Sequence, residues 1–316
     1  MNVLITGVSG YLGRSLLDHL LKKGVKVIGT DTAPIDINSP DFIFEQADIR
    51  DKDKHVEILK KHNISHVFHF AFILGEVKNQ KKALSVNIGG TRSILKAVDE
   101  VKSVKRIIFA GSVSAYGARK TNRLYIKEQH PLRASTLKYG INKRLMEETV
   151  AKIIPKLRKD LELVMLRVCT IVGPTARDGG AVDSFLAVPF GASIIGHDCP
   201  IQFIHEHDLL NIFDKALEKE KFSGVYNVSP RQTVTVKQLC KKLKKRCLPI
   251  PYSVLYAAFY LLFRIKPELE ISENSVSYLA YPIIVDCTKI EKDLGIEFRY
   301  SSLQAFISCV NDLRKK

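Results

Sequence analysis

The feature that most constrains this chain is a junction near its start, where an apolar run gives way to regularly spaced glycines. Residues 3–5 read Val-Leu-Ile, and Gly7, Gly10 and Gly13 then occupy every third position. From Tyr11 onward leucines recur at the three- and four-residue spacing of an amphipathic helix, namely Leu12, Leu16, Leu17, Leu20 and Leu21. The pattern predicts a strand, a tight turn and a helix.

Each glycine in this turn has a distinct physical use. Gly7 permits the tight turn, Gly10 lets the backbone come close to a pyrophosphate, and Gly13 lets the helix pack closely on the strand. The free amides at the start of the helix then point at the anion. A second strand is predicted at residues 25–30, and it ends at Asp31, which can accept hydrogen bonds from both hydroxyls of a ribose. The alternative is an ordinary surface turn with a chance acidic residue.

The order Thr6-Gly7-x-x-Gly10-x-x-Gly13 resembles the extended short-chain dehydrogenase/reductase superfamily, and in it the NAD-dependent epimerase/dehydratase family with its UDP-glucose/UDP-galactose 4-epimerase-like proteins. The resemblance implies an α/β fold, a Rossmann-type doubly wound parallel sheet with a smaller C-terminal substrate-binding lobe. It implies an NAD-binding domain at residues 1–173, toward which residues 202–228 weave back, and a lobe formed mainly by residues 174–316. It also implies cofactor contacts from the turn residues Ser9, Tyr11 and Leu12.

The residues at the end of the second predicted strand favour NAD over NADP. Thr32 follows Asp31, and no arginine comes close behind. A 2′-phosphate would meet a carboxylate there and find no cation to pair with.

Two later segments resemble the parts of the family that contact the cofactor. Asp48 and Ile49 match the pair beside the adenine, where the carboxylate accepts from the exocyclic amine and the aliphatic side chain packs on the ring; Asp48 is also compatible with a helix cap. The segment His69-Phe70-Ala71 resembles the His-x-Ala segment under the pyrophosphate and nicotinamide ribose. We expect the backbone of Ala71 to act there, and not the chemistry of His69.

A long helix is predicted over residues 83–101, and it carries the sequence Asn87-Ile88-Gly89-Gly90-Thr91. This resembles the family's Asn-Val-x-Gly-Thr, in which the asparagine braces the active site from the middle of a helix. Two consecutive glycines inside a helix cost about 1 kcal/mol each relative to alanine. A neighbouring strand or the cofactor is therefore expected to come close at this point.

The candidate catalytic residues are Ser112, Tyr139 and Lys143. The family places its catalytic Ser or Thr four residues before a Tyr-Gly pair, which is the position of Ser112, with Ser114 as the second choice. Tyr139 and Lys143 are four residues apart and therefore share one helical face. They match the family's Tyr-x-x-x-Lys pair, and the family also implies that both contact the cofactor. The alternative for Tyr139 is an ordinary residue of an amphipathic helix.

The resemblance implies that Tyr139 takes a proton from a substrate hydroxyl while hydride leaves the same carbon for NAD. A tyrosine is a poor base at its usual pKa near 10, and a neighbouring ammonium together with a positive nicotinamide ring favours the phenolate. The resulting ketone can be released, re-reduced from the other face, or lose water from the next carbon. Dehydratases of the family often carry Asp-Glu after the catalytic residue, and this chain has Val113 and Ser114 there.

The chain departs from the 4-epimerases at two positions. Thr170 stands where they carry an asparagine, and Ile201 stands where they carry an arginine that holds the diphosphate. Arg177, Arg231 or Lys266 could substitute for that arginine. The sequence therefore predicts a nucleotide-sugar epimerase, with an NAD-dependent dehydrogenase or reductase of an apolar substrate, as in the sterol and flavonoid branches, as the alternative. A non-catalytic NAD-binding protein is a third possibility, although such relatives usually lose the active-site Tyr or Lys.

The formal net charge of +16 suits an anionic substrate, a membrane surface or nucleic acid. The densest basic cluster lies between Lys237 and Arg246 and has the pattern of the solvated face of an amphipathic helix. No aromatic interleaving or nucleic-acid motif accompanies it, so no nucleic-acid partner is expected.

Residues 249–263 contain no charged side chain, but the stretch is shorter than the roughly 20 apolar residues that a membrane span needs. It is predicted to be a buried helix of the lobe, a wall of the substrate pocket or a helix at a membrane interface.

The six cysteines are scattered without a Cys-x-x-Cys pair, so neither a metal site nor a redox motif is predicted. Together with a start that lacks a basic, cleavable leader, they lead us to expect reduced thiols in a cytoplasmic protein. A homodimer is expected from the helices at residues 83–101 and 136–153, which the superfamily pairs across an interface.

Overall fold

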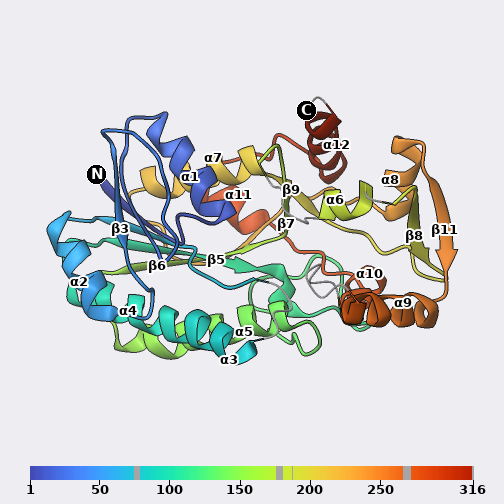
Figure 1. Cartoon of the computed structure of the whole chain (residues 1–316), viewed down its shortest axis with the longest axis horizontal. Helices are drawn as coiled ribbons and strands as arrows, with labels where there is room; N and C mark the ends of the chain where they lie inside the picture. Colours follow the sequence, from blue (N-terminus) through green and yellow to red (C-terminus); the bar gives the residue numbers. More distant parts are fainter. Residues whose placement is uncertain (75–78, 176–180, 187, 266–271, 315–316) are drawn as a thin grey trace. The chain divides into compact units, whose positions relative to one another are not determined.

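The computed structural model describes residues 1–74, 79–175, 181–186, 188–265 and 272–314. Its contacts divide the chain into two compact units (Figure 1). Unit 1 comprises Met1–Gly111, Asn142–Leu166 and Asp214–Val225, and unit 2 comprises Ser112–Ile141, Arg167–Phe213 and Tyr226–Lys316. The chain therefore passes between the units several times.

A seven-stranded sheet forms the centre of the Rossmann-type fold, with the strand order β10-β6-β5-β4-β1-β2-β3. Pairing is parallel between β1 and β2, β2 and β3, β1 and β4, and β4 and β5. The order reverses between β1 and β4, as in a doubly wound sheet, and the predicted fold class is confirmed. The strands are β1 Asn2–Thr6, β2 Lys26–Asp31, β3 Phe42–Gln46, β4 His66–His69, β5 Arg106–Ser112, β6 Glu162–Val168 and β10 Gly224–Val228.

The apolar run at the start of the chain is a central strand of this sheet. Val3, Leu4 and Ile5 are all fully buried, because a parallel strand covered on both faces needs apolar side chains at every position and not at alternate ones. The leucine stripe forms α1 Tyr11–Leu21, in which Leu16, Leu17 and Leu20 are buried. A further core cluster includes residues of α2 Lys52–Lys61, α4 Gly90–Glu100 and α5 Lys138–Ile153.

The helix predicted over residues 83–101 differs from the observed one. It is composed of α3 Gln80–Leu84, a π-helical turn Ser85–Gly89 and α4. A Cβ on Gly90 would lie 2.6 Å from Cγ2 of Ile49, whereas one on Gly89 would meet nothing within 4 Å. The close approach expected at the two glycines is therefore made at Gly90 alone, and by the Ile49 side chain.

Unit 2 contains two small parallel sheets. β7 Thr170–Val172 pairs with β9 Phe203–His205, and β8 Phe190–Ile194 pairs with β11 Arg246–Ile250. Phe203, Phe306 and Val310 belong to one core cluster here.

The remaining elements of the two units are a 3-10 turn Val113–Tyr116, a 3-10 turn Ile154–Lys156, α6 Ala181–Leu186, α7 Glu206–Glu218, α8 Val236–Leu243, α9 Tyr252–Ile265, α10 Ser275–Ala280, α11 Thr288–Leu294 and α12 Ser302–Arg314.

The uncharged stretch at residues 249–263 ends β11 and forms most of α9 (Figure 1). Leu255 is the buried residue of this helix, and most of its other side chains are exposed to solvent. The expectation of a buried lobe helix is therefore wrong. Among the helices of the described residues, none is both long and apolar enough to cross a lipid bilayer.

Candidate active site

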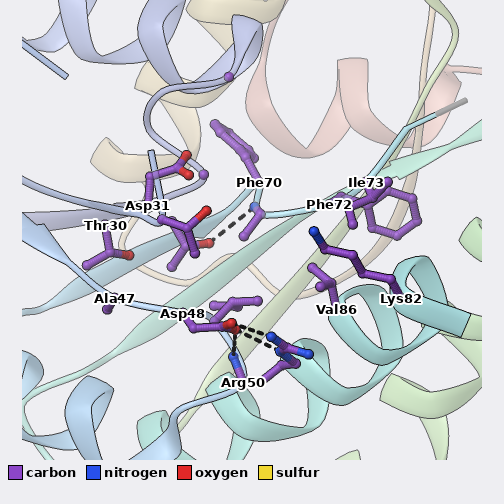
Figure 2. Close-up of a pocket in the computed structure, with 16 residues that line it drawn as sticks. Thr30, Asp31, Ala47, Asp48, Arg50, Phe70, Phe72, Ile73, Lys82 and Val86 are labelled. Atoms are coloured by element: carbon purple, nitrogen blue, oxygen red, sulfur yellow. Dashed lines mark hydrogen bonds and ion pairs between the residues drawn. The ribbon is translucent and has the colours of Figure 1, made fainter. Parts of the chain in front are cut away.

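A pocket of about 390 Å³ opens in unit 1 where β1, β2 and β4 end (Figure 2). This is the edge at which open parallel sheets bind their ligands. Of the predicted cofactor residues, seven line it: Gly7, Gly10, Asp31, Asp48, Ile49, Phe70 and Ala71. The other seven are not among its lining residues, namely Ser9, Tyr11, Leu12, Gly13, Asn87, Tyr139 and Lys143.

The geometry of the glycine turn excludes larger residues at two of its three positions. Gly7 has φ 72°, and a Cβ there would lie 2.6 Å from the Ala71 nitrogen. A Cβ on Gly13 would lie 2.3 Å from the Gly7 oxygen, which explains why Gly13 acts through packing and not as part of the pocket. At Gly10 the only near atom is the Gly7 oxygen at 3.3 Å, so the backbone before α1 remains open to a ligand.

Asp31 is held in place by the turn that it faces. Its two carboxylate oxygens accept from the Ser9 nitrogen at 3.1 Å and from the Ala33 nitrogen at 3.2 Å. The Ser9 hydroxyl also donates to the Ala33 oxygen at 2.8 Å. A carboxylate has about four acceptor sites, so Asp31 keeps capacity for the hydroxyls of a ribose. Ser9 thus positions Asp31.

Asp48 is engaged by Arg50 at the floor of the pocket (Figure 2). Asp48 accepts from the Arg50 backbone nitrogen and Nε at 2.9 Å each, and from Nη2 at 2.5 Å. These bonds lower the pKa of Asp48. Asp48 is not the helix cap considered for it, because the Asp51 side chain caps α2. One acceptor site remains on Asp48 for an exocyclic amine.

Lys82 is a pocket residue that the sequence motifs did not indicate. It lies on α3, lines the pocket, and extends its ammonium group toward the residues at the strand ends (Figure 2). Phe72, Ile73 and Val86 complete this side with apolar surface. The sequence signal that could have pointed to this segment is Asn79, whose side chain caps the start of α3 three residues before Lys82.

The pocket fits NAD on its own chemistry. It combines a backbone free of side chains at Gly10, a carboxylate at Asp31 for a ribose and a cation at Lys82 for a phosphate. Apolar walls with a few fixed polar groups are typical of cofactor sites of this size.

Two predicted residues support the pocket from behind. The buried Asn87 side chain accepts from the Ile73 nitrogen at 2.7 Å and donates to the Ile73 oxygen at 3.1 Å. The His69 ring lies 2.9 Å from the Thr6 hydroxyl, and burial lowers the pKa of His69 to about 3. His69 is therefore neutral and structural, in keeping with the expectation that Ala71 and not His69 serves the cofactor.

Two of the predicted catalytic residues, Ser112 and Tyr139, lie in unit 2 and are hydrogen-bonded to each other. Ser112 ends β5, and its hydroxyl accepts from the Ser114 nitrogen at 3.2 Å. Burial raises the pKa of Tyr139, and a hydrogen bond to Ser112 opposes that rise. Tyr139 can approach Ser112 because the next residue is Gly140. A Cβ at that position would lie 2.7 Å from the Ser114 oxygen.

Lys143 follows Tyr139 by about one turn of α5 and lies buried in unit 1. Its Nζ donates to the Ala110 oxygen at 2.7 Å and lies 3.7 Å from the centre of the Phe72 ring. Burial lowers the pKa of Lys143 to about 7. Its charge is therefore sensitive to anything that binds beside Phe72, which lines the pocket.

Among the described residues, neither Ile201 nor its proposed substitute Arg231 offers a free cation for a diphosphate. Ile201 bonds through its backbone to Val234 and packs in the core of unit 2. Arg231 is exposed and pairs with Glu291. Arg177 and Lys266 lie outside the described residues.

Comparisons with known proteins agree with this fold. A UDP-glucose 4-epimerase of Bacillus subtilis is 28% identical over 283 residues, covering 78% of this chain and 82% of its own. The fold matches UDP-glucose 4-epimerase of Thermotoga maritima, solved with UDP-glucose, with a TM-score of 0.78 and 22% identity over 100% of this chain and 99% of that one. It also matches the Bordetella bronchiseptica enzyme WbmG in complex with NAD, with a TM-score of 0.77 and 19% identity over 100% and 94%.

The sequence model of one family matches residues 3–229, which is most of the chain and includes the pocket, Ser112, Tyr139 and Lys143. This chain is an enzyme that belongs to the NAD-dependent epimerase/dehydratase family.

Proposed function

We propose that the protein is a nucleotide-sugar 4-epimerase that acts by reversible oxidation at the sugar carbon. The observation that carries this proposal is the Tyr139 hydroxyl, hydrogen-bonded to Ser112 and followed on α5 by the buried Lys143. Epimerisation needs only this set and a retained NAD.

Bound NAD, held by the Gly10 backbone, Asp31 and Lys82, would supply a reversible hydride acceptor for the sugar carbon. Tyr139 removes the proton from the hydroxyl on that carbon and gives it back at the end. Ser112 holds the same oxygen by a hydrogen bond. Because burial raises the pKa of Tyr139, its phenolate forms only with positive charge nearby, and Lys143 in its protonated form supplies such charge.

Two features support a sugar nucleotide and disfavour dehydration. The net charge of +16 suits a diphosphate, and the relatives include UDP-glucose 4-epimerases. Val113 and Ser114 occupy the places of the Asp-Glu pair that a dehydratase uses, and a buried valine cannot transfer a proton.

A reductase of an apolar ketone or alcohol is the second candidate. Ile201 favours it, because it stands where 4-epimerases hold the diphosphate with an arginine. The exposed surface of α9 does not add to this case, since no residue of α9 lines the pocket of unit 1.

The deciding experiment incubates the NAD-loaded protein with UDP-glucose and follows UDP-galactose by chromatography. We expect interconversion by the parent protein and loss of at least about a hundredfold in Tyr139→Phe, which removes the proton-transfer group and leaves the packing of the ring. NAD binding by calorimetry should be the same in both. Reduction of a sterol-like or aromatic ketone without epimerisation of UDP- or dTDP-sugars would favour the second candidate.

We further propose that the enzyme is a homodimer. A groove in unit 1 between the π-turn region and α5 carries the apolar side chains Leu84, Ile88 and Leu145 beside charged Arg92 and Glu148. Light scattering should give twice the mass of one chain at micromolar concentration, and a monomer would contradict the proposal. A cytoplasmic location stays a prediction from the cysteine pattern.

A further inference from the structure

Helix α9 of unit 2 uses only one narrow face to pack on its own unit. Leu255 is buried in a cluster with Ile194 of β8 and Val276 of α10, and Tyr252 and Phe259 lie at the margin of that cluster. These positions share one side of the helix, at the three- and four-residue spacing of an inward stripe. The rest of α9 is therefore available to a partner.

The outward side of α9 is apolar. Val254, Leu261 and Ile265 follow one another at helical spacing and are 55%, 57% and 74% exposed. Tyr256 and Tyr260 are also exposed, on another side of the helix, where the Tyr256 ring stacks with that of Tyr252. Soluble monomers rarely expose contiguous apolar surface of this kind, and such surface marks a site of interaction with a protein or a membrane.

The chain that leads into α9 carries charge of one sign. The sequence contains no Asp or Glu between Glu220 and Glu268. Exposed basic side chains precede α9 on α8 and β11, and Arg264 lies over the Tyr260 ring, with 4.9 Å from its Cζ to the ring centre. The exposed residues that precede α9 are Lys237, Lys241, Lys242, Lys244 and Arg246. On the acidic side, Asp198 lies 3.9 Å from Lys237, and Glu268, Glu270 and Glu273 follow α9 in the sequence.

This combination distinguishes between two occupants. A second copy of the chain would bring another set of the same positive charges, with +16 on each chain, against the patch. An anionic bilayer instead gains about 1 kcal/mol for each Lys or Arg held near its surface. Apolar side chains flanked by tyrosine and basic residues are what the boundary between headgroups and acyl chains accommodates.

The length of the helix determines how it meets a bilayer. The 14 residues of α9 span about 21 Å, less than the roughly 30 Å of a hydrocarbon core. We propose that α9 lies in the plane of an anionic membrane surface, with Val254, Leu261 and Ile265 inserted among the acyl chains. The enzyme is then a peripheral membrane protein, whichever reaction its active site performs.

The first test is sedimentation of the NAD-loaded protein with vesicles of equal parts phosphatidylcholine and phosphatidylglycerol. We expect binding that weakens with added salt and with pure phosphatidylcholine. Leu261→Asp should reduce binding about tenfold or more, because it removes an apolar side chain that would insert among the acyl chains and adds a negative charge. Leu124→Asp is the matched control, since Leu124 belongs to the same unit and is 54% exposed. Thermal unfolding should be alike for both variants.

The second test uses the absence of tryptophan from the sequence. Tyr260→Trp introduces a single emitter, which should shift to shorter wavelength on adding the anionic vesicles, whereas Leu124→Trp should not. Equal vesicle binding by Leu261→Asp and the parent protein, or no binding by the parent, would overturn the proposal. Absence of vesicle binding together with an oligomer that Leu261→Asp dissociates would assign α9 to a second copy instead.

Discussion

Strand β1 and helix α9 each contain an uninterrupted apolar run, yet the two runs have opposite environments. Val3, Leu4 and Ile5 are fully buried, whereas Val254 and Leu261 are more than half exposed. The strand is paired on both sides by β2 and β4 and covered by helices. In the part of the chain that the structure describes, α9 packs on a core cluster of its unit through Leu255, with Tyr252 and Phe259 at the margin. Apolar sequence thus predicts that a segment avoids water, but it does not tell what covers it.

The largest effect expected from this contrast compares two leucines. Leu4→Ala should lower the free energy of unfolding by about 3 kcal/mol, because it leaves a cavity in the core. Leu261→Ala should change it by less than about 0.5 kcal/mol. Urea unfolding followed by circular dichroism measures both. A large loss of stability in Leu261→Ala would mean that α9 is covered within the protein, and the contrast would fail.

The next effect distinguishes packing from ligand approach within the glycine turn. Gly13→Ala should lower the free energy of unfolding by about 2 kcal/mol, because its Cβ would meet the Gly7 carbonyl at 2.3 Å. Gly10→Ala should leave stability nearly unchanged and weaken NAD binding. Its Cβ would occupy space in the pocket that the cofactor needs and would not enter the protein core. Urea unfolding and calorimetry with NAD provide the two readouts. The opposite assignment of effects would show that Gly10, and not Gly13, is the packing position.

A third effect concerns the buried charge of Lys143. Because its pKa is about 7 in the folded protein and near 10.5 when unfolded, the unfolded chain binds more protons between these values. The stability of the NAD-free protein should therefore rise with pH across that window, by up to about 1.4 kcal/mol per pH unit from this group. In Lys143→Met that contribution should vanish. Parallel pH profiles for the parent and the variant would show that Lys143 keeps an ordinary pKa.

The smallest effect concerns Asp31, which lines the pocket of unit 1. Asp31→Ala should weaken NAD binding about tenfold, because the ribose hydroxyls lose their hydrogen bonds to a charged group. The same change should reduce the preference for NAD over NADP. Calorimetric titration with both dinucleotides tests this. NADP binding as tight as NAD binding in the parent protein would contradict the role given to Asp31.

Local patterns in the sequence predict the fold and seven of the residues that line the pocket. The strand–turn–helix at the start, the residues that end β2 and β4, and the position of Ser112 all follow from short motifs, because strand ends of a parallel sheet converge on one edge. Tyr139 and Lys143 were placed on one helix by their spacing alone. The roles of these residues in catalysis stay predictions.

What the sequence by itself determined is therefore everything that depends on neighbours along the chain: the turn glycines, the leucine stripe of α1 and the order of the motifs. Only the tertiary structure showed that Ile49 requires Gly90, that Arg50 engages Asp48, that Lys82 reaches the pocket and that α9 is exposed. The physical reason is that these outcomes depend on side chains brought together from distant segments. Periodicity records which face of an element avoids water, but the neighbour that meets that face is chosen only when the elements pack.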